Sequence, residues 1–161
     1  MHQAIKKGMS FGLSSAVITV MGIIVGTHSA TDLKHAIIAA VIVVAAADSL
    51  SDLFGVHFSE KSAKDTTNAE AWISAVSTFL TKLLFGLSFL IPIFAFQDLH
   101  TAILVDLIYG MIALSIYVYY VAKGRNEKII PTIIGQIILA LVVISVSHYI
   151  GNWVEAKFNI N

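Results

Sequence analysis

Two aspartates, Asp48 and Asp52, directly follow an apolar run at 36–47 that carries no charge. An α-helix turns once in about 3.6 residues, so a spacing of four puts both carboxylates on one face, shared with Ser51 and Gly55. An ionised carboxylate inside a bilayer costs roughly 2.5–3.5 kcal/mol on insertion scales, and such residues generally mark functional sites. The pair is therefore the first candidate site.

The composition places this segment in a membrane protein. Hydrophobic residues make up 57% of the chain and charged residues 12%, and the mean hydropathy is +0.84. These values predict an all-α integral membrane protein with multiple spans. A span needs about 20 residues, so five spans leave only short loops, and residues 1–161 form a single transmembrane domain. The net charge of zero gives no support for nucleic-acid binding, and the absence of Cys excludes thiol chemistry.

The apolar segments predict five transmembrane helices, at 8–27, 33–58, 71–96, 101–121 and 130–152. Pro92 is expected to kink or end the third helix, because proline removes a backbone donor. Pro131 suits the first turn of the fifth helix.

Basic residues are distributed unevenly between the two sides that these helices define. One side carries Lys6, Lys7, Lys61, Lys64, Lys123, Arg125 and Lys128, and the other carries Lys34 and Lys157. The positive-inside rule then predicts a cytoplasmic N-terminus and an external C-terminus. The membrane is the cell membrane in a prokaryote or an organelle membrane.

The first helix carries a stripe of small residues. Gly8 and Gly12, and again Gly22 and Gly26, form GxxxG patterns, which let helix backbones approach closely in lipid. The interpretation that we favour is a homodimer interface. The alternative is that these glycines seat the helix against its own chain.

Lys82 is the natural partner of the aspartates. It lies about ten residues into the third helix, and at about 1.5 Å per residue this matches the depth of Asp48. We expect it to neutralise one carboxylate at most, which leaves a site for a proton or a cation. A purely structural salt bridge is the alternative.

Several other side chains complete the predicted site. Asp48, Asp52, Ser51 and His57 are the candidate metal ligands, and Ser15, Thr19 and Met21 are candidate pathway residues. Oxygen donors of this kind favour hard divalent ions such as Mn²⁺, Mg²⁺ or Fe²⁺. The alternatives are an interfacial polar role for His57 and a packing role for Met21.

Further polar residues belong to the opposite side of the membrane. Asp106 is expected to lie near the outer surface, where it caps the fourth helix or guards an exit. The topology groups His28, His35 and His100 on the same side, which hints at an external metal or proton site.

Four stretches of the sequence resemble the vacuolar iron transporter family: FGLSSAVITVMGIIVG, ADSLSDLFGVHFSEKS, the Asn68-Ala-Glu sequence before the third helix, and SHYIG near the C-terminus. The resemblance implies a homodimer of five-helix subunits that moves Fe²⁺, and often Mn²⁺, out of the cytosol in exchange for protons. It also implies a pathway between the subunits that is lined by the first two helices.

The chain departs from the family pattern at ligand positions. Phe11 stands where the family has an aspartate, Asp52 replaces a methionine and Val56 replaces a glutamate. The loop 60–70 is short where many members insert an acidic metal-binding domain. If a two-fold axis brings two copies of Asp48 and Asp52 together, the four acids cannot all stay ionised, and metal binding would release protons.

The sequence therefore predicts a proton-coupled exporter of Fe²⁺- or Mn²⁺-like cations, with the metal as cargo and no tightly bound cofactor. It is not expected to be an enzyme, because it has no HExxH motif, no Gly-rich phosphate loop and no usefully spaced Ser/His dyad. The alternatives are a non-transporting membrane scaffold and a transporter of another cation or substrate on the same fold.

Overall fold

Five long apolar helices dominate the protein. The computed structural model describes residues 2–63 and 65–158, so Lys64 of the predicted basic side lies outside the described residues. The helices are α1 (His2–Thr31), α2 (Lys34–Lys61), α3 (Asn68–Ser88), α4 (Leu90–Ala95), α5 (Leu99–Gly124) and α6 (Ile129–Phe158). Five spans are long and apolar enough to cross a membrane, with α3 and α4 together forming the third. The predicted five-helix composition is confirmed, although most helices extend several residues further into their polar flanks.

The third span is interrupted where proline predicts it. α3 ends at Ser88 and α4 begins at Leu90, with Phe89 between them. Pro92 cannot donate to the carbonyl of Ser88, four residues earlier, and its ring crowds that carbonyl. The interruption therefore falls one turn before the proline, and the Phe89 N–H donates to the Gly86 carbonyl instead (3.4 Å).

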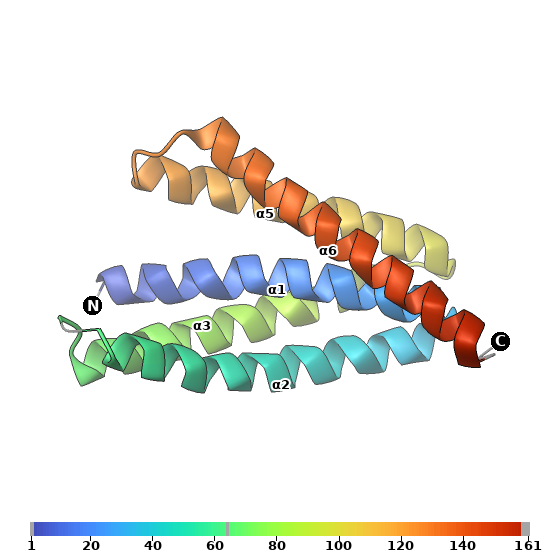
Figure 1. Cartoon of the computed structure of the whole chain (residues 1–161), viewed down its shortest axis with the longest axis horizontal. Helices are drawn as coiled ribbons and strands as arrows, with labels where there is room; N and C mark the ends of the chain where they lie inside the picture. The colour runs from blue at the N-terminus through green and yellow to red at the C-terminus, as the bar shows by residue number, and fades with distance from the viewer. Residues whose placement is uncertain (1, 64, 159–161) are drawn as a thin grey trace.

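α1 is the central element of the bundle. It lies between the α2/α3 pair and the α5/α6 pair (Figure 1). Its buried residues Val17, Met21 and Ile24 form the core together with Phe89 and Leu114. The N-terminus, the α2–α3 loop and the α5–α6 loop share one end of the bundle, and the α1–α2 and α4–α5 loops share the other.

The glycines of α1 contact the chain's own helices. A Cβ on Gly8 would lie 2.2 Å from the Ser74 carbonyl oxygen of α3, and one on Gly12 would lie 2.7 Å from that of Thr78. Gly22 and Gly26 face α6, where a Cβ would lie 2.9 Å from Val143 and 3.3 Å from the Ser147 carbonyl oxygen respectively. Gly8, Gly12 and Gly22 are buried, whereas Gly26 is half-buried and lines a second cavity of about 390 Å³. The predicted homodimer interface at these four glycines stays a prediction. The alternative, seating within the chain, is what the contacts support.

We expect Gly8→Ala to lower stability by about 1–3 kcal/mol, because the methyl group meets a backbone carbonyl that moves only if α1 and α3 separate. Thermal unfolding in detergent micelles measures the change. Gly135→Ala is the matched control, because a Cβ there meets no atom within 4 Å and alanine favours a helix. Equal melting temperatures for the two variants would contradict the close approach of α1 and α3.

Candidate cation site

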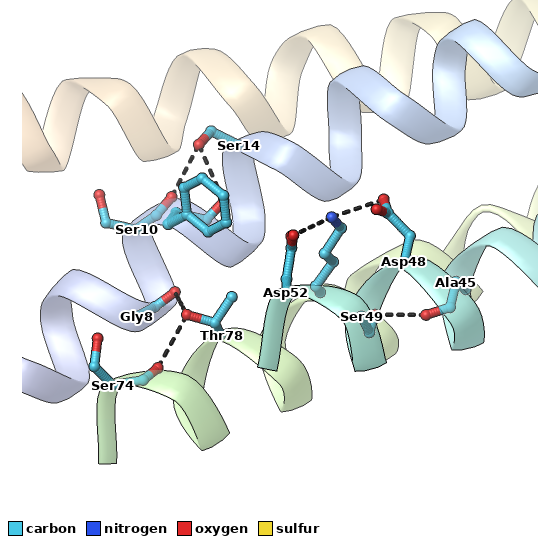
Figure 2. A network of polar contacts seen from close by, with 11 residues as sticks. Gly8, Ser10, Ser14, Ala45, Asp48, Ser49, Asp52, Ser74 and Thr78 are labelled. Atoms are coloured by element: carbon cyan, nitrogen blue, oxygen red, sulfur yellow. Dashed lines mark hydrogen bonds and ion pairs between the residues drawn. The ribbon is translucent and has the colours of Figure 1, made fainter. Parts of the chain in front are cut away.

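Lys82 joins the two aspartates into a three-residue cluster. Its ammonium donates to Asp52 Oδ2 and lies 2.7 Å from Asp48 Oδ2. The carboxylates project from one face of α2 toward α1, one turn apart (Figure 2). The sequence predicted that Lys82 would neutralise one carboxylate, whereas the structure places it between both. A single ammonium reaches both because their four-residue spacing aligns them along the helix.

The three charged side chains differ in how far they are exposed. The side chain of Lys82 is 4% exposed, whereas those of Asp48 and Asp52 are 35% and 22% exposed. The ammonium contacts only the Oδ2 atom of each carboxylate, and a carboxylate has about four lone-pair positions. With all three groups ionised, the cluster carries one net negative charge, so it can accept a further cation.

A cavity of about 410 Å³ opens beside Asp52, between α1, α2 and α3. It is lined by Lys7 and Phe11 of α1, by Asp52, Gly55, Val56, Ser59 and Glu60 of α2, and by Ser74 and Thr78 of α3. The α2 residues fall on one face because they are spaced by about one turn. Phe11 of α1 therefore shares one cavity with Asp52 and Val56 of α2.

A second acid lines this cavity toward the N-terminal end of the bundle. Glu60 is largely buried and forms an ion pair of 2.5 Å with Lys7, which is exposed. The sequence analysis did not assign Glu60 to the site. The helical spacing could have predicted this position, because Glu60 follows Asp52 by eight residues and so lies on the same face of α2 two turns later.

Hydroxyl groups complete the polar lining. Thr78 Oγ1 donates to the carbonyls of Gly8 (3.1 Å) and Ser74 (2.9 Å), which ties α1 to α3 (Figure 2). The Ser74 hydroxyl is buried and has no hydrogen-bond partner among the described residues. With two carboxylates in the lining, the cavity offers oxygen donors suited to a hard divalent ion.

His57 does not join the carboxylates. It is buried and stacks on Trp72, with ring centroids 4.0 Å apart. It follows Asp52 by five residues, which rotates it away from the lining face toward α3. The structure therefore does not bring His57 together with Asp48 and Asp52, and its role as a metal ligand stays a prediction.

The remaining predicted residues also lie off the cavity lining. Ser51 is exposed on α2, and Ser15 and Thr19 are half-buried on α1. Met21 is fully buried in the core, where its sulfur lies 2.6 Å from the Cβ position of Gly110. Met21 packs α1 against α5, as the alternative interpretation held, and so its assignment to the pathway is corrected.

Asp106 neither caps α5 nor lies at the surface. It is fully buried, and both carboxylate oxygens lack a hydrogen-bond partner among the described residues. The cap is Asp98, which accepts hydrogen bonds from the Thr101 backbone N–H (2.7 Å) and hydroxyl. These two hydrogen bonds hold the pKa of Asp98 below its usual value. The cap expectation for Asp106 was wrong because Asp106 lies inside α5, well past its start at Leu99.

The site combines paired acids and a buried ammonium near the middle of a spanning helix with an adjacent cavity. No protein-family model matches the chain, and no curated protein matches it. The chemistry of these residues is therefore the basis for a functional assignment.

Proposed function

We propose that the protein moves divalent cations of the Mn²⁺ and Fe²⁺ class across a membrane in exchange for protons, on a scaffold of the vacuolar iron transporter type. The observation that carries the proposal is the cluster of Asp48, Asp52 and Lys82 near the middle of α2, beside an open cavity. Acids at this depth are costly and generally serve transport of ions or protons.

The ammonium of Lys82 acts as a resident cation in the empty site. A divalent ion that binds the carboxylates of Asp48 and Asp52 repels this ammonium at short range. The metal-bound cluster then contains two carboxylates, one divalent ion and a deprotonated lysine, so its formal charge is zero. A low-dielectric environment favours such a neutral cluster. Release of the lysine proton when metal binds couples the two ions, and the return of a proton expels the metal.

The position of the family's ligand sites supports the resemblance. Phe11 is distant in sequence from Asp52 and Val56, yet all three line the same cavity. In this chain the acidic groups near the cavity are Asp48, Asp52 and Glu60. The chain would keep the family's route and redistribute its ligands along α2.

The exposure of α2 supports a homodimer. The side chain of Asp48 is 35% exposed near the middle of the helix, and Ser51 and Gly55 of the same face are also exposed. Hydrocarbon cannot solvate a carboxylate, so this face must meet protein or water. A second copy that covers it would place up to four carboxylates around the two-fold axis. The dimer contact that we propose is therefore this α2 face and not the glycines of α1.

The unequal distribution of Lys and Arg supports a cytoplasmic N-terminus and an external C-terminus. In this orientation the cavity opens toward the cytosol through Lys7 and Glu60, and export is the direction of transport. The membrane is the cell membrane of a prokaryote or an organelle membrane.

A non-transporting scaffold is the second candidate, and one observation favours it. Lys82 contacts both acids, so the cluster satisfies much of its own charge without any ligand. In that case the three groups would only hold α2 against α3, and their joint replacement would have no consequence beyond stability.

Transport is tested by reconstituting the protein in liposomes and measuring uptake of Fe²⁺, Mn²⁺, Co²⁺, Zn²⁺ and Mg²⁺ under an imposed pH gradient. We expect uptake of Mn²⁺ and Fe²⁺ that rises with the gradient and exceeds uptake by protein-free liposomes. Absence of uptake for all five ions by a correctly folded protein would reject the transport proposal.

A further inference from the structure

Three potential metal ligands converge at the end of the bundle opposite the cavity mouth. They are His28 near the end of α1, Asp32 in the α1–α2 turn and His100 in the first turn of α5. Their ligand atoms all lie within 4.8 Å of one another. The sequence grouped His28 and His100 by topology but included His35, which does not belong to this cluster, and omitted Asp32.

The backbone holds these side chains in place. Asp32 has a φ of 48°, in the left-handed region that aspartate tolerates, and its N–H donates to the His28 carbonyl (2.9 Å). This turn directs the carboxylate back along α1, so that Oδ1 lies 3.0 Å from His28 Nδ1. A contact across two loops, from Lys34 Nζ to the Phe96 carbonyl (2.8 Å), brings the start of α5 to the end of α1.

His100 completes the cluster from the other helix. Its ring meets that of His28 edge to face, with centroids 4.9 Å apart. The carboxylate of Asp32 and the negative end of the α1 dipole favour a cation at this position.

We propose that His28, Asp32 and His100 bind a divalent transition metal of the Zn²⁺ or Co²⁺ class. Two imidazole nitrogens and one carboxylate oxygen are ligands that such ions take, with a fourth position open to water. Ligand atoms of a tetrahedral site lie about 3.3 Å apart when each is about 2.0–2.1 Å from the metal. Rotation of the exposed side chains of Asp32 and His100 closes the present separation.

This site is independent of the proposed cation pathway. Its ligands come from α1, its following turn and α5, whereas Asp48, Asp52 and Lys82 lie on α2 and α3. A metal here would join the end of α1 to the start of α5. Its nitrogen ligands favour Zn²⁺ or Co²⁺, whereas the carboxylate oxygens of Asp48 and Asp52 favour Mn²⁺ or Mg²⁺.

Titration of the detergent-solubilised full chain with Co²⁺ tests the site, because coordination of Co²⁺ by nitrogen and oxygen gives visible absorption bands. We expect one equivalent of Co²⁺ per chain in this spectral signal, displaceable by Zn²⁺. His28→Ala and His100→Ala should each weaken binding at least about tenfold. His35→Ala is the matched control, since it removes an exposed histidine from the same end of the bundle and should leave binding unchanged.

Two outcomes would overturn the assignment. One is the absence of a saturable Co²⁺ signal in the wild type, and the other is an equal loss in His35→Ala and His28→Ala. Replacement of Asp48 and Asp52 by Asn together with Lys82→Met should leave the Co²⁺ signal in place. This comparison separates a failure of the histidine site from a failure of the transport proposal.

Discussion

Lys82→Met should cause the largest loss of stability of any single substitution in the cation site, about 3–5 kcal/mol. The substitution removes the ammonium of Lys82, which contacts both Asp48 and Asp52, and leaves two neighbouring carboxylates without it. Methionine keeps the length and the apolar stem of lysine, so the loss reports the charge and not the packing. Thermal or denaturant unfolding in detergent micelles measures it.

Removal of the acids should reverse this effect. Asp48→Asn and Asp52→Asn on the Lys82→Met background leave three neutral side chains, and we expect most of the lost stability to return. Lys128→Met is the control, because this lysine is exposed in the α5–α6 loop and its loss should change stability by less than about 0.5 kcal/mol. If Lys82→Met is as stable as Lys128→Met, the ion pairs of Lys82 with Asp48 and Asp52 do not contribute to stability, which would contradict this prediction.

The same neutral triple variant should abolish transport. Without ionised oxygens at positions 48 and 52, a divalent ion loses the ligands that replace its hydration shell, and without the ammonium there is no proton to exchange. We expect the initial rate of Mn²⁺ uptake to fall at least tenfold while the protein stays folded.

This variant is more informative than the replacement of the two aspartates alone. Asp48→Asn with Asp52→Asn would leave the buried ammonium of Lys82 without a counter-charge, which is expected to destabilise the protein strongly. With all three groups neutral, a loss of transport cannot be attributed to a loss of stability. If the protein is a scaffold, the triple variant should differ from the wild type in stability alone. If the protein is a transporter, the triple variant should be folded but inactive.

The sequence predicted the helices and the depth of the charges well. Both depend on local properties, namely the length of apolar runs and a rise of about 1.5 Å per residue. The same counting matched Lys82 with Asp48 across two helices. It could not show that one ammonium would reach both carboxylates, because that depends on the rotation of α3 about its own axis.

The partners of the glycines could not be predicted. A GxxxG pattern predicts only that another helix packs closely against it. It does not indicate whether that helix belongs to the same chain or to a second copy. In this fold, Gly8 meets α3 and Gly22 meets α6, because α1 is central. Only the arrangement of all the helices determines this.

Helical phase could have corrected two other assignments. Counted from Asp52, Glu60 returns to the same face after eight residues, and His57 lies well away from it after five. Glu60 lines the cavity and His57 stacks on Trp72. Asp32 was a different case, since its left-handed backbone conformation directs it toward His28 and no spacing rule predicted that turn.

The most direct test of the proposed exchange is simultaneous measurement of Mn²⁺ uptake and lumenal pH in liposomes that contain the wild type or the neutral triple variant at positions 48, 52 and 82. The exchange mechanism predicts that Mn²⁺ entering wild-type vesicles drives protons out, and that both movements disappear together in the folded variant. Mn²⁺ uptake at the wild-type rate by the variant, or wild-type uptake with no change in lumenal pH, would contradict it.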